Sequence, residues 1–180
     1  MPERKTRVSR RPKPATTEDM PRIRVLTRAD RGKWIELRRE LWNHHSSKDL
    51  ARDADNLLGA ARGANFLRGS MLATVLLAET AHGEIVGFAE VDLRPYVDGC
   101  RSAPVGYLEG WYVAPAHRRR GVGRALVRAA ERWARAQGCS EMASDTGLDN
   151  TVSQQAHRTL GYAEVERLVH FRRDLNGPAK

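Results

Sequence analysis

The chain has 180 residues, of which 41% are hydrophobic and 29% charged, and its formal net charge is +9. This composition is that of one soluble globular domain with an ordinary core, since no apolar run is long enough to span a membrane. The N-terminus lacks the apolar stretch of a signal peptide, and Cys100 and Cys139 are too few for a disulfide framework, so we expect a cytoplasmic protein with reduced thiols.

Residues 1–20 differ in composition from the rest of the chain. They hold six lysines and arginines, three acids and three prolines, with almost nothing apolar to bury. Such a segment is typical of a disordered basic extension. It lacks interleaved aromatic residues, so we do not expect nucleic acid as a partner. The folded domain is expected at 21–176 and a short C-terminal tail at 177–180.

Hydrophobic periodicity predicts an alternation of strands and helices after residue 21. Strands are expected at 23–26, 71–79, 84–93, 107–113 and 141–145, with one or two closing strands at 162–173. Helices are expected from a cap formed by Thr27 and Asp30 up to Trp42, at 48–58, after a turn at 118–124, and at 151–160. Segments 59–69 and 96–104 are expected to be loops, and residues 81–83 the turn of a hairpin.

The strand at 107–113 leads into a basic turn that contains two glycines. Pro115 ends the strand, because proline cannot donate to a strand ladder, and a helical pattern begins directly after the turn. Glycine lets the backbone approach a ligand, and the N-terminus of a helix favours an anion. The turn therefore predicts a phosphate-binding site, which the positive net charge also suits. Its residues are Arg118, Arg119, Arg120, Gly121, Val122, Gly123 and Arg124.

The pattern Arg118-x-x-Gly121-x-Gly123 resembles the acyl-CoA loop of the GNAT superfamily of N-acetyltransferases. A P-loop would need Gly-Lys-Ser/Thr at its end, and a Rossmann loop would need a glycine where this chain has Leu126. The order of expected elements over about residues 22–174 is also the GNAT order. The resemblance implies an α/β (α+β) GNAT fold, with a mixed, mostly antiparallel sheet of six to seven strands, about four flanking helices and splayed central strands.

The same resemblance implies acetyl-CoA as co-substrate and no metal. Its pantetheine arm would insert where the central strands separate and bond to the backbone of Trp111, Tyr112 and Val113. The pyrophosphate would bind the turn at 118–124. Asn150 matches an asparagine that the family places opposite the pantetheine, and it is equally suited to cap the helix at 151–160.

Four segments are similar to the dimeric aminoglycoside 6′-N-acetyltransferases of this superfamily. They are ELWNHH at 40–45, RPYVDGC at 94–100, YLEGWYV at 107–113 and the long segment 141–171. The resemblance implies acetylation of an aminoglycoside 6′-amino group by a homodimer. Acetylation of another amine, such as a protein N-terminus, a lysine or a polyamine, is the alternative. Carried over by position, the expected substrate contacts are Trp42, His45, Tyr96, Glu109, Asp145 and Glu166.

Each of these side chains also suits an ordinary structural role. Glutamate in the middle of an apolar strand is costly unless its charge has a purpose or a partner. His44 and His45 lack a third ligand at a convincing spacing, so no metal site is expected there. The structural alternatives are a helix core for Trp42, a plain loop position for Tyr96, an arginine partner for Glu109, a cap of the turn into Gly147 for Asp145, and pairing with Arg167 or Arg172 for Glu166.

The resemblance implies direct acetyl transfer in a ternary complex, without an acyl-enzyme. A backbone N–H where the strands separate, that of Val113, would polarise the thioester carbonyl. Glu109 or Asp145 would accept the ammonium proton, and the sequence does not choose between them. His157 stands where most of the superfamily has a tyrosine that protonates the thiolate, so the general acid stays unassigned.

Overall fold

The computed structural model describes residues 20–61, 63 and 65–176. Apart from Met20, the expected extension at 1–20 lies outside the described residues, as does the expected tail at 177–180. The strands are β1 (Arg22–Val25), β2 (Phe66–Arg68), β3 (Met71–Glu79), β4 (Ile85–Arg94), β5 (Val105–Val113) and β6 (Met142–Ser144). The helices are α1 (Arg31–Leu41), α2 (Ser47–Gly59), α3 (Val122–Ala136) and α4 (Thr151–Leu160), with 3-10 turns at Arg28–Asp30 and Pro115–His117.

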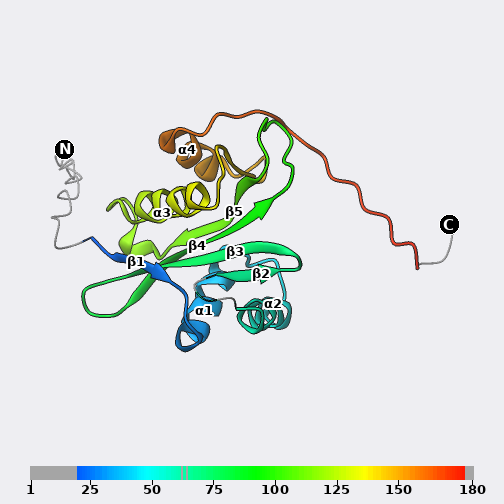
Figure 1. Cartoon of the computed structure of the whole chain (residues 1–180). Helices are drawn as coiled ribbons and strands as arrows, with labels where there is room; N and C mark the ends of the chain where they lie inside the picture. The colour runs from blue at the N-terminus through cyan, green and yellow to red at the C-terminus, as the bar shows by residue number, and fades with distance from the viewer. Residues whose placement is uncertain (1–19, 62, 64, 177–180) are drawn as a thin grey trace, which may run out of the picture.

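The strands form one mixed sheet in the order β1-β3-β4-β5-β6, with β2 also paired to β3. Neighbours are antiparallel except β5 and β6, which run parallel. Helices α1 and α2 lie on one face of the sheet, and α3 and α4 lie on the other (Figure 1). Side chains alternate between two cores, as strand geometry requires: Val75 and Leu77 pack with the α1 and α2 side, whereas Leu76 and Ala78 pack with α3. The expected fold is confirmed.

Short polar residues begin the helices where the sequence predicted or allowed a cap. The Asp30 carboxylate accepts hydrogen bonds from N and Oγ1 of Thr27, at 2.9 and 2.7 Å, ahead of α1. Oδ1 of Asn150 accepts a bond of 3.0 Å from the backbone N–H of Ser153, so Asn150 does cap α4. The hairpin turn at 81–83 is also present, with Gly83 at φ +81°.

Two expectations about secondary structure were wrong. Segment 59–69 is not wholly a loop, because Phe66–Arg68 forms β2 against the start of β3. Residues 162–173 form no strand; the segment runs away from the domain in Figure 1. A strand needs a neighbour for its backbone hydrogen bonds, and within the described part of this single chain none is paired with these residues. Among the described residues no helix is both long and apolar enough to cross a membrane.

Candidate active site

Glu109 lies at an irregularity in the pairing of β4 with β5. Glu90 pairs with Gly110 and Val91 with Leu108, so Glu109 has no partner of its own in the register. Such a bulge re-aims side chains and is common beside active sites. A Cβ on Gly110 would lie 2.5 Å from Cζ2 of Trp42, so glycine is required here for the indole to pack against the strand. The bulge and Gly110 together bring the carboxylate and the indole to one place.

A cavity of about 340 Å³ opens at this place, between the sheet and helices α1 and α2. Its lining is mostly charged, with guanidinium and carboxylate groups around one indole. The lining residues are Arg38, Trp42, His45, Asp49, Leu50, Arg52, Asp53, Arg68, Glu90 and Glu109. Three of the expected substrate contacts, Trp42, His45 and Glu109, are therefore brought together by the fold.

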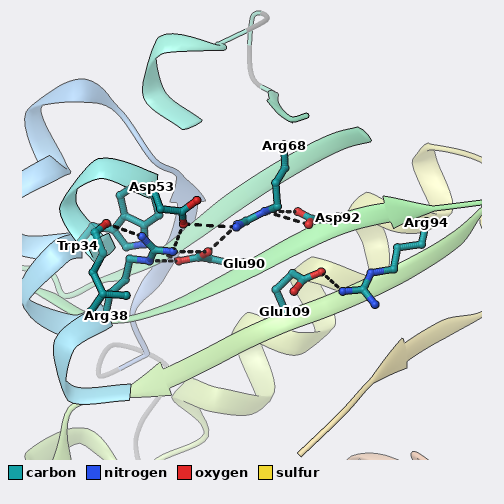
Figure 2. Close-up of polar contacts among 9 residues, drawn as sticks. Trp34, Arg38, Asp53, Arg68, Glu90, Asp92, Arg94 and Glu109 are labelled. Carbon is teal, nitrogen blue, oxygen red and sulfur yellow. Dashed lines mark hydrogen bonds and ion pairs between the residues drawn. The ribbon is translucent and has the colours of Figure 1, made fainter. Parts of the chain in front are cut away.

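The floor of the cavity is a network of ion pairs around the buried residues Arg38 and Glu90 (Figure 2). Glu90, only 1% exposed, accepts a hydrogen bond of 3.1 Å from Nε1 of Trp34. Its carboxylate lies 2.8 Å from both Arg38 and Arg68. Arg38 also reaches Asp53 at 2.5 Å, which ties α2 to α1. Strand β4 therefore anchors guanidiniums from α1 and from β2 directly beneath the cavity.

Burial and charge oppose each other in this network. Burial raises the pKa of Glu90, and the charges of Arg38 and Arg68 act against that rise. Burial alone would lower the pKa of Arg68, but the surrounding carboxylates raise it above its ordinary value. Taking charges out of water is expensive, and good ion-pair geometry only offsets the cost. We infer that the network fixes the cavity floor more than it stabilises the fold.

Glu109 and Asp145, the two expected proton acceptors, lie on one chain of contacts. Glu109 forms an ion pair of 2.5 Å with Arg94, so the predicted arginine partner is present. The Arg94 guanidinium lies 3.3 Å from the ring centroid of Tyr107, whose hydroxyl donates a 2.5 Å hydrogen bond to Asp145. Burial, followed by the Asp145 hydrogen bond, raises the pKa of Tyr107. Asp145 itself is exposed and is not among the cavity-lining residues.

Tyr96 and Glu166 lie elsewhere, at the loop 96–104 and on the extended C-terminal segment. Tyr96 is 69% exposed and donates a 2.8 Å hydrogen bond to Asp98. Val165 contacts this loop, since a Cβ on Gly99 would lie 2.6 Å from its Cγ2. In the single chain these two expected contacts are thus near the loop and not at the cavity.

Sequence reasoning missed five charged residues of the cavity floor: Arg38, Asp53, Arg68, Glu90 and Asp92. The signal that was available is the run Phe88–Leu93, in which Glu90 and Asp92 interrupt an apolar strand on one face. A charge there is costly without a partner, as was argued for Glu109. Their partners come from distant segments of the chain. The run therefore indicates that buried charges are paired, but it does not identify the residues with which they pair.

The residues expected to contact the cofactor lie on the other side of β5. The ladder between β5 and β6 covers only Gly106 to Leu108. Beyond it, the Ala114 N–H bonds to Val86 on β4, so by strand alternation the N–H groups of Trp111 and Val113 face the opposite edge. Nε of Arg118, from the basic turn, donates to the Val113 carbonyl at 2.8 Å, so a polar side chain meets the strand at this edge.

The basic turn places the N-terminus of α3 beside the edge of β5 that lies beyond its ladder with β6. Gly121 precedes α3 with φ +87°, a left-handed conformation that side chains other than glycine rarely adopt. A Cβ on Gly123 would lie 2.7 Å from Cζ3 of Trp111. The second glycine therefore allows the first turn of α3 to pack against β5 at Trp111.

Replacement of Gly123 by valine is expected to displace the start of α3 from Trp111 and to weaken acetyl-CoA binding at least about tenfold. Calorimetry with acetyl-CoA measures the change. Gly32→Ala on α1 is the matched control, because a Cβ there has no atom within 4 Å. Unchanged affinity in a folded Gly123 variant would contradict the assignment of this turn.

His157 lies where β5 and β6 separate. Nε2 lies 3.0 Å from Oγ of Ser144, and Nδ1 lies 2.8 Å from the Ser153 carbonyl. Trp111 and Tyr162 pack edge-on against the ring. The imidazole is therefore held in one orientation beside the expected pantetheine site.

Strands β5 and β6 separate beside a basic helix N-terminus, and a cavity with several carboxylates lies on the other side of β5. Together these features define the class of N-acetyltransferases that use an acyl-CoA. The model of the acetyltransferase (GNAT) family matches residues 31–162, and the chain belongs to this family. The predicted superfamily is thus confirmed.

Relatives within the family carry a narrower description. The chain is 42% identical over 160 residues to aminoglycoside N(6′)-acetyltransferase type 1 of Klebsiella aerogenes, covering 88% of this chain and 99% of the relative. It is 44% identical to the protein of that name from Stenotrophomonas maltophilia, covering 88% and 97%. A solved structure of AAC(6′)-Iy in complex with the bisubstrate analogue CoA-S-monomethyl-acetylneamine is similar with a TM-score of 0.73 and 36% identity, over 85% of this chain and 97% of that one.

Proposed function

We propose that the protein transfers the acetyl group of acetyl-CoA to the 6′-amino group of aminoglycosides, by direct attack in a ternary complex. The names of the relatives and the bisubstrate analogue in the similar structure support this substrate pair. The position of the acidic cavity supports it independently, because the cavity and the expected cofactor edge lie on either side of the same strand, β5.

The observation that carries the proposal is the charge of the cavity. The chain as a whole is positive, at +9, which repels a polycationic drug at long range. The cavity lining nevertheless holds four carboxylates (Asp49, Asp53, Glu90, Glu109) against three guanidiniums (Arg38, Arg52, Arg68). A pocket with four carboxylates and one indole in its lining suits a ligand that has several ammonium groups and sugar rings.

The residues on the two sides of β5 would divide the chemistry between them. The N–H of Val113, which faces the open edge, would polarise the thioester carbonyl. Glu109, which lines the cavity, would accept a proton from the ammonium as the amine attacks, and Asp145 would act through Tyr107 and Arg94 or through water. We propose that the start of α3, Asn150 and the backbone of Trp111 to Val113 hold the cofactor.

A thiol-release assay tests the activity. The full chain is incubated with acetyl-CoA and with separate panels of aminoglycosides, polyamines and peptides. Turnover is expected with aminoglycosides that carry a 6′-amino group and not with analogues that carry a 6′-hydroxyl. Turnover only with polyamines or peptides would favour the alternative, a member of the family that acetylates another amine.

We also propose that the protein is a homodimer that forms through its C-terminal segment, and that it is cytoplasmic. Residues 163–174 are exposed and have neither helix nor strand in the single chain. Several large apolar side chains on this segment are left in solvent, with Phe171 94% exposed. These are Val165, Leu168, Val169, Phe171 and Leu175. A second copy that pairs with the segment would remove both the apolar surface and the unpaired backbone groups from water.

Truncation after Gly161 is expected to convert the dimer into a monomer and to lower thermal stability by several degrees. Light scattering at matched concentrations measures the first effect, and a thermal scan the second. Phe171→Ser is the milder variant, expected to weaken the dimer without removing the segment. A native protein that is monomeric at all concentrations would rule the proposal out.

A further inference from the structure

Asp92 is a fully buried carboxylate, 0% exposed, on the same face of β4 as Glu90. Arg68 is its cation, with Nε 2.9 Å from Oδ2, yet Oδ2 has no hydrogen-bond partner in this arrangement. The same guanidinium also forms an ion pair with Glu90, with Nη2 of Arg68 2.8 Å from Oε2 of Glu90. Asp92 is therefore only partly compensated, in a place where an uncompensated charge is expensive.

The guanidiniums around Asp92 do not balance the carboxylates. Arg38 and Arg68 contact Asp53, Glu90 and Asp92, while Arg94 contacts Glu109. Three guanidiniums thus face four carboxylates, and one negative charge is left over. Asp49 and Arg52 at the cavity wall pair with each other and do not change the count.

The excess charge falls on Asp92, which shares its cation with Glu90, and Glu109 lies on the strand paired with that of Asp92. Burial, together with the charge and hydrogen bonding of Glu109 and against the effect of Arg68, raises the pKa of Asp92 to about 7. A proton on Asp92 removes the excess charge, and the Asp92 carboxyl group can then donate a hydrogen bond to Glu109. The other charged or titratable groups that face the pair are Arg38 from α1, Asp53 from α2, Arg68 from β2, Glu90 and Arg94 from β4, Tyr107 from β5 with Asp145 behind it, and His45 at the cavity wall.

We propose that Asp92 is a positioning residue of the acetyl transfer, acting through Glu109: the two carboxyl groups hold one proton in the empty enzyme and exchange it for the ammonium of the substrate. This inference rests on the proposed function. An ammonium at Glu109 supplies the positive charge that the network lacks, so the shared proton leaves to solvent when the substrate binds. The pair is then doubly ionised and faces the amine to be acetylated.

The protons balance over one turnover. The ammonium passes one proton to the ionised pair, which restores the shared proton, and the free amine attacks the thioester carbonyl carbon. The carbon–sulfur bond breaks, and the second amine proton ends on the CoA thiolate. One proton has been released to solvent, as the overall reaction of an ammonium with a thioester requires. The carboxyl groups of Asp92 and Glu109 thereby return to the protonation state that they had before the substrate bound.

Infrared difference titration of the native protein without substrate tests the pair apart from any activity. The band of a protonated carboxyl group is expected to disappear with a midpoint near pH 7, where the pKa of Asp92 lies. Asp92→Asn should remove that transition, and Glu109→Gln should move its midpoint to lower pH, because the charge of Glu109 raises the pKa of Asp92 while the burial of Asp92 stays. Glu131→Gln, on α3 across the sheet, is the matched control and should leave it in place.

Kinetics then test the link to catalysis. With a 6′-amino aminoglycoside, kcat/KM of the native protein is expected to fall about tenfold per pH unit below the transition, because the proton competes with the substrate. In Asp92→Asn this acid limb should move to lower pH, and the plateau should drop on the order of tenfold. Asp92→Glu should restore the limb. A purely structural role would lower stability and leave the limb where it is.

The outcomes are separable. A native protein without a carboxyl transition near pH 7 overturns the inference, and so does an acid limb unchanged in folded Asp92→Asn. If Asp92→Asn does not fold, the native titration and Glu109→Gln still decide. If aminoglycosides are not turned over at all, the proposed function fails, while the infrared titration still reports whether the pair exists.

Discussion

Glu109→Gln and Asp145→Asn are expected to lose roughly tenfold to a thousandfold in kcat/KM for a 6′-amino aminoglycoside, with native affinity for acetyl-CoA. Each amide keeps the shape of the side chain and removes its charge. A charge-assisted hydrogen bond to an ammonium contributes about 1.5–3 kcal/mol, and a positioned proton acceptor adds at least about a hundredfold. Glu109 lines the cavity and Asp145 does not, so the larger loss is expected at Glu109.

The control for this pair of variants is Asp98→Asn. Asp98 accepts a hydrogen bond from Tyr96 on the exposed loop and does not line the cavity. Cofactor affinity is measured by calorimetry and turnover by thiol release. Full efficiency in both Glu109→Gln and Asp145→Asn would make these carboxylates structural, and a loss of acetyl-CoA affinity would place them on the cofactor side instead.

Arg38→Met is expected to lower the free energy of unfolding by about 3–5 kcal/mol, the largest stability loss that we predict. The Arg38 side chain is buried between the rings of Trp34 and Trp42, whose centroids lie 4.9 and 5.0 Å from the guanidinium carbon. Methionine keeps much of that packing. It leaves Glu90 buried with only Arg68 as a cation. Urea unfolding followed by tryptophan fluorescence measures the loss.

Arg31→Met is the matched control on the same helix. Arg31 pairs with Asp55 in solvent, and an exposed pair of this kind contributes little to stability, so the unfolding midpoint should hardly change. The double variant Arg38→Met with Glu90→Gln should recover part of the loss, because it removes the uncompensated charge. Equal effects of Arg31→Met and Arg38→Met would refute the importance of burial in this network.

The closing segment shows one limit of prediction from a single chain. Its alternation of apolar and polar residues is typical of a strand, and the sequence predicted one or two strands at 162–173. The structure leaves that segment unpaired, with Phe171 in solvent. Whether a strand forms depends on a neighbour, and local sequence does not contain the neighbour. The same reason explains β2, which is only three residues long and is a strand because β3 lies beside it.

The sequence by itself determined the order of most elements, the cap of the 3-10 turn ahead of α1, the cap of α4, the family, and the turn at Gly121 and Gly123. These features depend on periodicity and on residues close together in the chain. Only the tertiary structure decided which charges meet. Arg38 and Glu90 are 52 residues apart, and Tyr107 and Asp145 are 38 apart. Coulomb interactions depend on distance in space and on burial, and both follow from how the sheet and the helices pack. The sequence could therefore name Glu109 as a costly charge, while the fold alone gave it Arg94, Asp92 and a cavity.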